Sequence, residues 1–554
     1  MRNIFALSCL CLLAGAALGA ESLAAVPAGE RPGFQRIRES DLRADLGFLA
    51  SDATQGRMSL QPGDEVAAQW IAAEFAKAGL EPAAQDTSGR ASFFQDVPLI
   101  EYRPDRDKNF VSLSRAGQTR TWKTPDLLGG YHDDVVVSTS VVFAGYGITA
   151  PGLDYDDYRN LDVRGKIVLI FEHEPQENDA RSRFNGTGNT RYATNRVKGL
   201  IAQAHGAVAV LILGEPNRQH PSNLERIARI GGSVTRSVPI PGQILVNDEL
   251  HIPVVTVSDA FGRELLASAG ETPQALQSAI DQDLSNHSTE LKDSQVTLHL
   301  ENRSRTTGVT QNVAGLLKGT DPKLAPDTII ISAHHDHDGA IPNAAGGSDI
   351  WHGADDNGSG TVGVVELARA FGANAARPKR SILFVVFAAE ERGLLGAYYM
   401  AAHPLRPLET TRAMINFDMI GRDESPSEQT NGLIDIPADT SNRLNLIGAA
   451  YSPDYQRTVA AANRAVGLDL DERFDHENAL NVFFRSDQFP FVLHDVPAFW
   501  WFTGFHPDYH HITDSADKID YRKMAKILRL AYLSAWGFAT EPTVPAFVPD
   551  PRGG

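Results

Sequence analysis

The chain has 554 residues, 42% of them hydrophobic, which is enough length for about three or four domains and enough apolar content for buried cores. Its 69 acidic and 51 basic residues give a formal net charge of −18, which argues against nucleic acid or an anionic membrane surface as the main partner. No pattern in the sequence specifies an oligomeric state.

Residues 1–20 combine a short basic start, an apolar run and a small-residue end, the pattern of a secretory signal peptide cleaved between residues 19 and 25. A membrane anchor and a lipoprotein are the alternatives, but the run is short and the sequence before Cys9 is a poor lipobox. Both cysteines, Cys9 and Cys11, lie in this segment, so the mature chain has no thiol to offer. We expect an exported protein, periplasmic or extracellular, without stable membrane insertion after cleavage.

Residues 33–125 are expected to form the N-terminal part of the main domain. A strong helix is predicted over 64–79, with Val66, Trp70 and Phe75 on its apolar face. From residue 126 the sequence changes to short β-like segments around one or two helices, which predicts a compact inserted α/β module ending near 290. The polar segment 271–293 is interpreted as a connection.

Residues 291–545 alternate between strand and helix patterns. Such alternation predicts a mixed, largely parallel twisted sheet with helices on both faces. The main strands expected are 296–300, 313–317, 328–332, 381–387, 411–417 and 497–502, and the helices are 361–371, 394–403, 454–466 and 521–538.

Residues with metal-ligand chemistry follow several of these strands. Open α/β sheets place their sites at the carboxyl ends of strands, so the side chains after different strands should converge. The segments concerned are His334-x-Asp336, Asp355-Asp356-Asn357-Gly358, Glu390-Glu391, Asn416-x-Asp418, Arg485-Ser486-Asp487 and the run His506-Pro507-Asp508-Tyr509-His510-His511. Each has an ordinary structural explanation when taken alone, and their coincidence is what favours a site.

The chemistry that this set suits is hydrolysis. Two divalent ions close together need a bridging carboxylate and further nitrogen or oxygen ligands, and they can activate a water and polarise a carbonyl. A carboxylate that does not bind metal is then needed to carry the water's proton to the leaving amine. Adjacent glutamates at a strand end can meet both needs.

These segments resemble, in the same order, the signature segments of the co-catalytic dizinc aminopeptidases related to bacterial leucyl aminopeptidase, with glutamate carboxypeptidase II as a more distant relative. The metal ligands that the resemblance implies are His334, Asp355, Glu391, Asp418 and His510. It implies that Asp355 bridges two zinc ions, that Glu390 is the general acid/base and that Asp336 orients His334. It also implies a cis peptide after the bridging aspartate, at Asp355-Asp356. Cobalt or manganese would accept the same ligands.

Other segments extend or complicate the resemblance. Residues 142–148, 164–168, 204–207 and 252–255 resemble a protease-associated domain, so the main domain would be discontinuous around this insert. His337 and His352 are interpreted as histidines at the rim. His511 is the alternative to His510, which we prefer because Asp514 then keeps the family interval.

The function that the resemblance implies is removal of the N-terminal residue from peptide substrates. The arginines closest to the expected ligands, Arg392, Arg422 and Arg485, are scattered, whereas a substrate carboxylate would need clustered arginines. A dizinc carboxypeptidase or dipeptidase, a glutaminyl cyclase and a non-catalytic receptor on the same scaffold are the alternatives. The complete ligand set argues against the last two.

Overall fold

The computed structural model of the chain describes residues 26–222, 224–226, 239–343 and 345–549. The signal peptide expected at residues 1–20 lies outside these ranges. Among the described helices, we find none that combines the length and the apolar character needed to cross a membrane.

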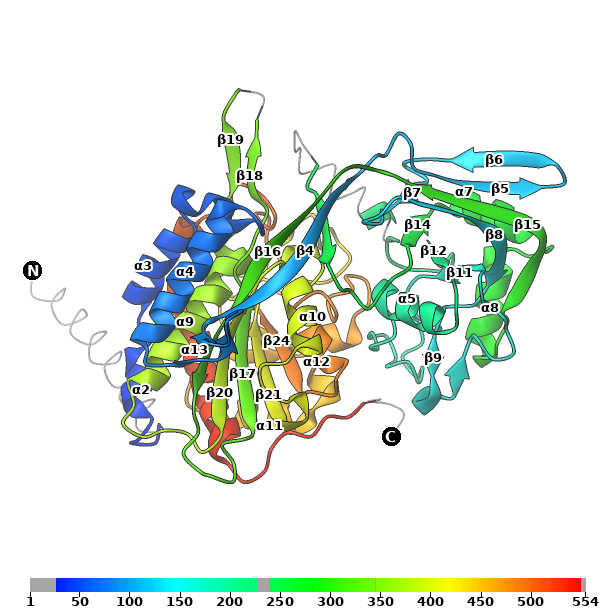
Figure 1. The fold of residues 1–554 in the computed structure, drawn as a ribbon. Helices are drawn as coiled ribbons and strands as arrows, with labels where there is room; N and C mark the ends of the chain where they lie inside the picture. The colour runs from blue at the N-terminus through cyan, green and yellow to red at the C-terminus, as the bar shows by residue number, and fades with distance from the viewer. Residues whose placement is uncertain (1–25, 223, 227–238, 344, 550–554) are drawn as a thin grey trace, which may run out of the picture.

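The main domain is built on a ten-stranded mixed sheet with the strand order β13-β4-β16-β20-β17-β21-β24-β22-β23, and β1 pairs with β16 (Figure 1). Its centre, β20-β17-β21-β24, is parallel, and antiparallel pairs flank it. The strands are β1 (Glu81–Pro82), β4 (Phe94–Pro104), β13 (Gly242–Leu245), β16 (Asn302–Leu317), β17 (Thr328–His334), β20 (Ser381–Phe387), β21 (Thr411–Phe417), β22 (Arg443–Ile447), β23 (Asp469–Asp471) and β24 (Ala498–Phe502).

Helices cover both faces of this sheet, which explains why its central strands are apolar on both sides. Ile329 and Ile331 of β17 pack with α9 and α13, whereas Ile330 belongs to the opposite core with α10 and α12. The helices of this domain are α2 (Arg31–Arg36), α3 (Glu39–Leu49), α4 (Pro62–Lys77), α9 (Gly360–Gly372), α10 (Leu395–Ala402), α11 (Pro453–Asn463), α12 (Gln488–Val492) and α13 (Tyr521–Thr540).

A second, eight-stranded sheet forms the insert, with its own apolar core. Its order is β6-β5-β15-β8-β11-β12-β14-β7, with β8, β11, β12 and β14 parallel. The strands are β5 (Phe110–Arg115), β6 (Gln118–Trp122), β7 (Leu127–Leu128), β8 (Val135–Phe143), β11 (Ile167–Phe171), β12 (Ala209–Leu213), β14 (Val254–Val257) and β15 (Thr289–Leu300), and the helices are α5 (Asn195–Ala204), α7 (Asp259–Ala267) and α8 (Pro273–Asp283).

Three short ribbons complete the fold. They are β2 (Ala84–Gln85) with β3 (Ala91–Ser92), β9 (Thr149–Ala150) with β10 (Tyr155–Asp156), and β18 (Gly339–Pro342) with β19 (Ser348–Trp351). The β18–β19 ribbon projects from the main domain and belongs to the loop between His334 and the first acidic segment.

The structure confirms the mixed α/β sheet with a separate α/β insert and differs from the sequence in detail. The expected domain boundary at residue 126 would divide the insert sheet, because β5 and β6 lie before that residue but belong to this sheet. Conversely, β13 lies within the expected insert but pairs with β4 of the main sheet. The expected connection 271–293 contains α8. The buried face of α4 is turned from the expected one, because Ala67, Ile71 and Phe75 are buried whereas Val66 is 41% exposed.

Candidate metal centre

The expected site residues gather at the carboxyl ends of the four parallel central strands. His334 is the last residue of β17, Glu390 follows β20, Asp418 directly follows β21, and His510 lies in the turn after β24. Because these strands are neighbours in the sheet, side chains that are far apart in sequence meet at one edge.

His334 faces three carboxylates from three different segments. Its Nε2 is buried and has no hydrogen-bond partner among the described residues. It lies 3.5 Å from Asp356 Oδ1, 3.6 Å from Glu390 Oε2 and 3.7 Å from Asp418 Oδ1. Its Nδ1 lies 3.2 Å from the carbonyl oxygen of Asp336. With Nδ1 donating to that carbonyl, Nε2 presents its lone pair to a space bordered by carboxylates.

The central carboxylate is Asp356, and the expectation for Asp355 is corrected. The Asp355 side chain turns away to accept a hydrogen bond from the Gly421 amide at 2.7 Å and to meet His506 Nε2 at 3.2 Å. Asp356 instead reaches both His334 and His510. The cis peptide likewise lies at Asp356-Asn357, one residue later than expected. Neighbouring residues of this turn point to opposite sides, so a shift of one residue exchanges a ligand for a supporting group.

A second group lies on the other side of Asp356. His510 Nε2 is 3.0 Å from Asp356 Oδ2 and 3.3 Å from Glu391 Oε2. His337 Nδ1 is 2.6 Å from Glu391 Oε1, so this histidine is fully buried in the group and not at the rim. His511 points elsewhere, toward Glu428 at 3.7 Å, which favours His510 as the residue of the site.

Asp336 supports the glutamate pair more than His334. Its carboxylate accepts hydrogen bonds from the backbone amides of Glu390 at 3.0 Å and Glu391 at 3.2 Å, while it lies 3.6 Å from His334 Nδ1. The contact with His334 at hydrogen-bonding distance is made by the Asp336 carbonyl. Asp336 thus fixes the turn that presents both glutamates.

Asp418 is held by a chain of buried polar side chains. Ser486 Oγ donates to Asp418 Oδ2 at 2.6 Å, Asn416 Nδ2 donates to Ser486 Oγ at 2.8 Å, and Ser332 Oγ donates to Asn416 Oδ1 at 2.8 Å. One Asp418 oxygen is therefore fixed, which leaves the other facing His334. Such support orients metal ligands in proteins.

The two adjacent glutamates differ in their electrostatics. Burial raises the pKa of Glu390 well above its ordinary value. Burial acts in the same direction on Glu391, but His510 and His337 outweigh it and hold the pKa of Glu391 at about 2. Neighbouring acids with separated pKa values suit different roles: Glu390 is able to carry a proton, and Glu391 is a permanent anion.

Two further residues, to which the sequence assigned no role in the site, hold the loop in place. Arg57 is fully buried and donates to four backbone carbonyls, at Leu49, His335, His352 and Gly353, at 2.6–2.9 Å. Asp514 accepts the amides of Asp355 and Asp356 at 3.0–3.1 Å. A buried arginine has no local sequence signature. Asp514, in contrast, was noted in the sequence for its spacing from His510. His352 contacts Asp52 near the surface, as a rim residue would.

The donors fit divalent metal ions. Imidazole nitrogens and carboxylate oxygens come together in the groups His334–Asp356–Asp418, His337–Asp356–Glu391 and Asp338–Glu391–His510. The buried Nε2 atoms of His334 and His337 have no hydrogen-bond partner within the described ranges, and they are the kind of atom that a bound cation would satisfy. Asp356 belongs to two of these groups, as a bridging carboxylate must.

Comparison with known families agrees with this arrangement. The sequence model described as peptidase family M28 matches residues 312–534, and the PA domain model matches residues 135–265. Residues 312–534 are therefore a peptidase domain of family M28. Within this M28 protein, the second sheet is the core of an inserted PA domain, as the sequence indicated.

Named relatives cover parts of the chain. Aminopeptidase YwaD of Bacillus subtilis is 28% identical over 281 residues, which are 50% of this chain and 45% of the relative. Probable lipoprotein aminopeptidase LpqL of Mycobacterium tuberculosis is 24% identical over 402 residues, which are 67% of this chain and 61% of the relative. The chain therefore spans less than two thirds of the length of these two relatives.

A solved structure matches over nearly the whole chain. The aminopeptidase from Aneurinibacillus sp. strain AM-1 aligns with a TM-score of 0.51 at 19% identity, covering 93% of this chain and 97% of that one. At this identity the likeness concerns the fold. It places the insert and the main sheet in one shared architecture.

Proposed function

We propose that this M28 protein is an exported metallo-aminopeptidase that hydrolyses the N-terminal peptide bond of peptides with two zinc ions. The observation that carries the proposal is His334 Nε2, which is buried, faces carboxylates from three segments and lacks a hydrogen-bond partner in the part of the chain that the structure describes. A purely structural histidine would direct that nitrogen at a hydrogen-bond partner.

The proposed ligands divide between two ions. His334, Asp356 and Asp418 would hold one ion, and Asp356, Glu391 and His510 would hold the other, with Asp356 in the bridging position that the sequence assigned to Asp355. His337 supplies an additional imidazole beside Glu391. Zinc suits this mixture of nitrogen and oxygen ligands, although cobalt or manganese would also bind it.

Glu390 is the residue proposed to move the proton. Bound zinc ions would supply Lewis acidity, which lowers the pKa of a water and polarises the scissile carbonyl. Glu390 lies beside His334, and its raised pKa suits a group that accepts a proton and returns it to the leaving amine. Glu391, kept anionic by its histidines, is suited to remain a ligand throughout.

The arginines near the centre support cleavage at the N-terminal end. Arg392 pairs with Asp338 at 3.0 Å, Arg422 with Asp508 at 2.9 Å, and Arg485 contacts Tyr509. Each guanidinium thus already has a partner, so these three offer no cluster to receive the terminal carboxylate of a substrate. This supports an aminopeptidase over a carboxypeptidase of the same fold.

The proposal is tested with matched substrates. Purified protein is assayed on aminoacyl p-nitroanilides and on the same compounds with an acetylated amino group. We expect turnover of the free-amine series alone, with about two zinc ions at the centre in active preparations. Cleavage restricted to the blocked series would contradict an aminopeptidase.

Export is proposed from the N-terminal sequence pattern, and the relative named a probable lipoprotein supports it. The test is N-terminal sequencing of protein recovered from the periplasm or culture medium. We expect a start between residues 20 and 26; an intact Met1 in that material would contradict cleavage.

A further inference from the structure

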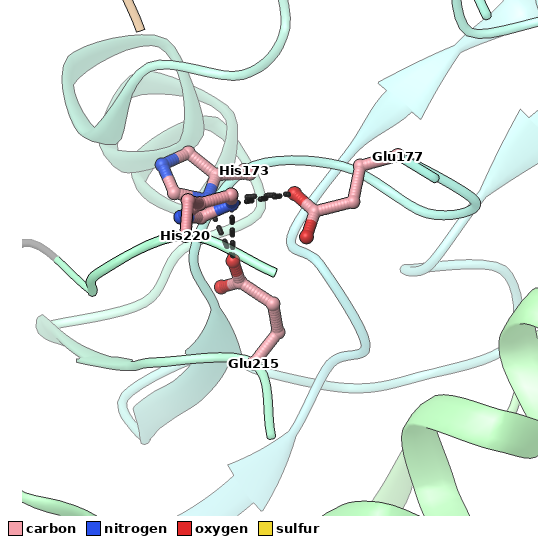
Figure 2. A group of neighbouring side chains, drawn as sticks. All are labelled: His173, Glu177, Glu215 and His220. Atoms are coloured by element: carbon pink, nitrogen blue, oxygen red, sulfur yellow. Dashed lines mark hydrogen bonds and ion pairs between the residues drawn. The ribbon is translucent and has the colours of Figure 1, made fainter. Parts of the chain in front are cut away.

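A second cluster of histidines and carboxylates lies in the insert, separate from the metal centre. His173 and Glu177 are in the loop after β11, and Glu215 and His220 are in the loop after β12 (Figure 2). The strands β11 and β12 are parallel neighbours, so both loops leave the same edge of the second sheet. Each of the four residues is at most 5% exposed.

The outer nitrogen of each histidine faces a protein acceptor. His220 Nδ1 lies 3.0 Å from the carbonyl oxygen of Pro221. His173 Nε2 contacts the side-chain amide of Asn481, whose oxygen faces the ring when its nitrogen donates to the Asn478 carbonyl at 2.8 Å. Both outer nitrogens therefore carry hydrogen, and in the neutral rings the inner nitrogens present lone pairs.

The inner nitrogens point at the two glutamates. His173 Nδ1 lies 2.7 Å from Glu215 Oε1 and 3.7 Å from Glu177 Oε2. His220 Nε2 lies 3.1 Å from Glu177 Oε2 and 3.3 Å from Glu215 Oε1. A lone pair this close to a carboxylate oxygen is unfavourable unless a proton or a cation lies between them.

Two protons are the alternative to a cation. Held by the rings, they would make both of them imidazolium ions, buried with their centroids 4.5 Å apart; held by the carboxyl groups, they would leave two neutral acids beside neutral rings. The remaining carboxylate oxygens, Glu177 Oε1 and Glu215 Oε2, are buried and have no hydrogen-bond partner among the described residues. The hydrogen bond of the buried Lys198 goes to the Phe171 carbonyl at 2.9 Å, not to either glutamate.

We propose that His173, Glu177, Glu215 and His220 form a structural binding site for one divalent metal ion of the zinc class. Four donors around a zinc ion at 2.0–2.2 Å are about 3.3–3.6 Å apart, a spacing that the four distances above bracket. Two imidazoles favour zinc over calcium or magnesium. Closure of the site by four protein ligands suits a structural role, because no position is left for a substrate.

The site also faces the main domain. Asn481, which contacts His173, and Asn478, whose Nδ2 donates to the Glu177 carbonyl at 2.7 Å, both belong to the loop before α12. The same loop continues to Ser486, which holds Asp418 of the metal centre. An ion in the insert would thus fix the surface on which this loop rests.

The experiment is a zinc count in three proteins. Full-length mature protein is stripped with a chelator, equilibrated with zinc, washed and analysed for bound metal. The variants are His173→Ala/His220→Ala in the insert and His334→Ala/Glu391→Ala in the metal centre. We expect the insert variant to bind one zinc fewer than its parent, and the metal-centre variant to retain one.

The controls separate this inference from the proposed function. His205→Ala/His251→Ala, which removes two exposed insert histidines, should bind as much zinc as the parent. Glu177→Gln/Glu215→Gln repeats the test with side chains of the same shape, and near-ultraviolet circular dichroism reports whether each variant is folded. If metal-centre changes alone abolish all binding, the insert site is refuted while the proposed function stands. If the parent binds a single zinc ion, and the insert changes remove it while the metal-centre changes do not, the proposed dizinc centre fails.

A measurement on the unmodified protein does not depend on folding of the variants. Crystals grown with zinc and measured at the zinc absorption edge should show anomalous density between the four insert side chains. Density at the metal centre without any in the insert would overturn the proposal and leave a proton-linked histidine–glutamate network.

Discussion

The metal centre and the insert cluster are made from the same side chains in the same topological position, yet they differ in how open they are. Both lie where parallel strands end. In the metal centre the His510 side chain is 22% exposed and that of Glu390 is 10% exposed, whereas the insert side chains are at most 3% exposed. A centre that processes substrate must leave a position accessible, and a structural site need not.

The largest expected difference between the two clusters is that only the metal centre catalyses a reaction, and Glu390→Gln tests this. Glutamine keeps the shape of the side chain but cannot accept and return a proton. We expect kcat to fall by about a hundredfold to ten-thousandfold, with zinc content unchanged. Loss of zinc instead would show that Glu390 is a ligand and that the roles of the two glutamates are exchanged. Activity and metal content are measured on the same preparation.

The pair Asp356→Asn and Asp355→Asn tests which aspartate belongs to the centre. Asp356→Asn should lose zinc and reduce activity by more than about a hundredfold, beyond the usual effect of a residue that only orients a ligand. Asp355→Asn should keep its zinc, because its contacts are the Gly421 amide and His506. Its expected cost is about 1–3 kcal/mol in the free energy of unfolding. The reverse pattern would restore the assignment made from sequence.

Asp157, in the insert, provides a buried acid that is not a metal candidate. Its oxygens accept hydrogen bonds from the Tyr146 and Ile148 amides and the Tyr155 hydroxyl at 2.8–3.0 Å. Burial nevertheless raises its pKa to about 7. Since the folded state holds the proton more tightly than the unfolded state, stability due to this group is complete below about pH 4 and is lost as the pH rises through 7.

Asp157→Asn should remove that pH dependence. The difference in unfolding free energy between the parent and the variant should shift against the parent by up to about 4 kcal/mol between pH 4 and pH 7. Denaturant unfolding at several pH values measures it. A constant difference would mean that Asp157 ionises normally in the fold.

The smallest expected effect is stabilisation of the insert by zinc. In the background His334→Ala/Glu391→Ala, zinc at a hundred times its dissociation constant should raise stability by about 2.7 kcal/mol, seen as an increase in the thermal midpoint. Adding Glu215→Gln should weaken or abolish the increase. An equal increase with and without Glu215 would place the responsible ion elsewhere and erase the contrast between the two clusters.

The sequence predicted the chemistry of the metal centre better than its register. Strand ends and ligand types located His334, Glu390, Glu391, Asp418 and His510, because apolar strands followed by acids and histidines are readable locally. Whether Asp355 or Asp356 faces the centre depends on the backbone of one turn, and adjacent acids look alike in sequence. The prediction of the buried face of α4 was wrong for a related reason. Val66 is apolar enough for a core, but the residues of α4 that are buried in the structure include Ala67 and Ile71.

The insert cluster was not foreseen because its signal is spread over two loops. His173 and Glu177 are separated from Glu215 and His220 by about forty residues, and the His205–Gly206 pattern nearby was used only for the domain resemblance. The pairing of β11 with β12 brings the loops together. Only tertiary structure therefore converts four unremarkable residues into a cluster.

The long ribbon that joins the two sheets has a consequence for biosynthesis. β4 of the main sheet pairs with β16 across the whole insert, while β5 and β15, which continue these strands, pair within the insert. On the ribosome, the segment before the insert must wait until β16 has been made before its sheet can form. An insert that folds first would hold the two ends of the ribbon together and shorten the effective loop that β4 and β16 must close. We therefore expect the order of synthesis to make the PA domain an internal template for assembly of the main domain around it.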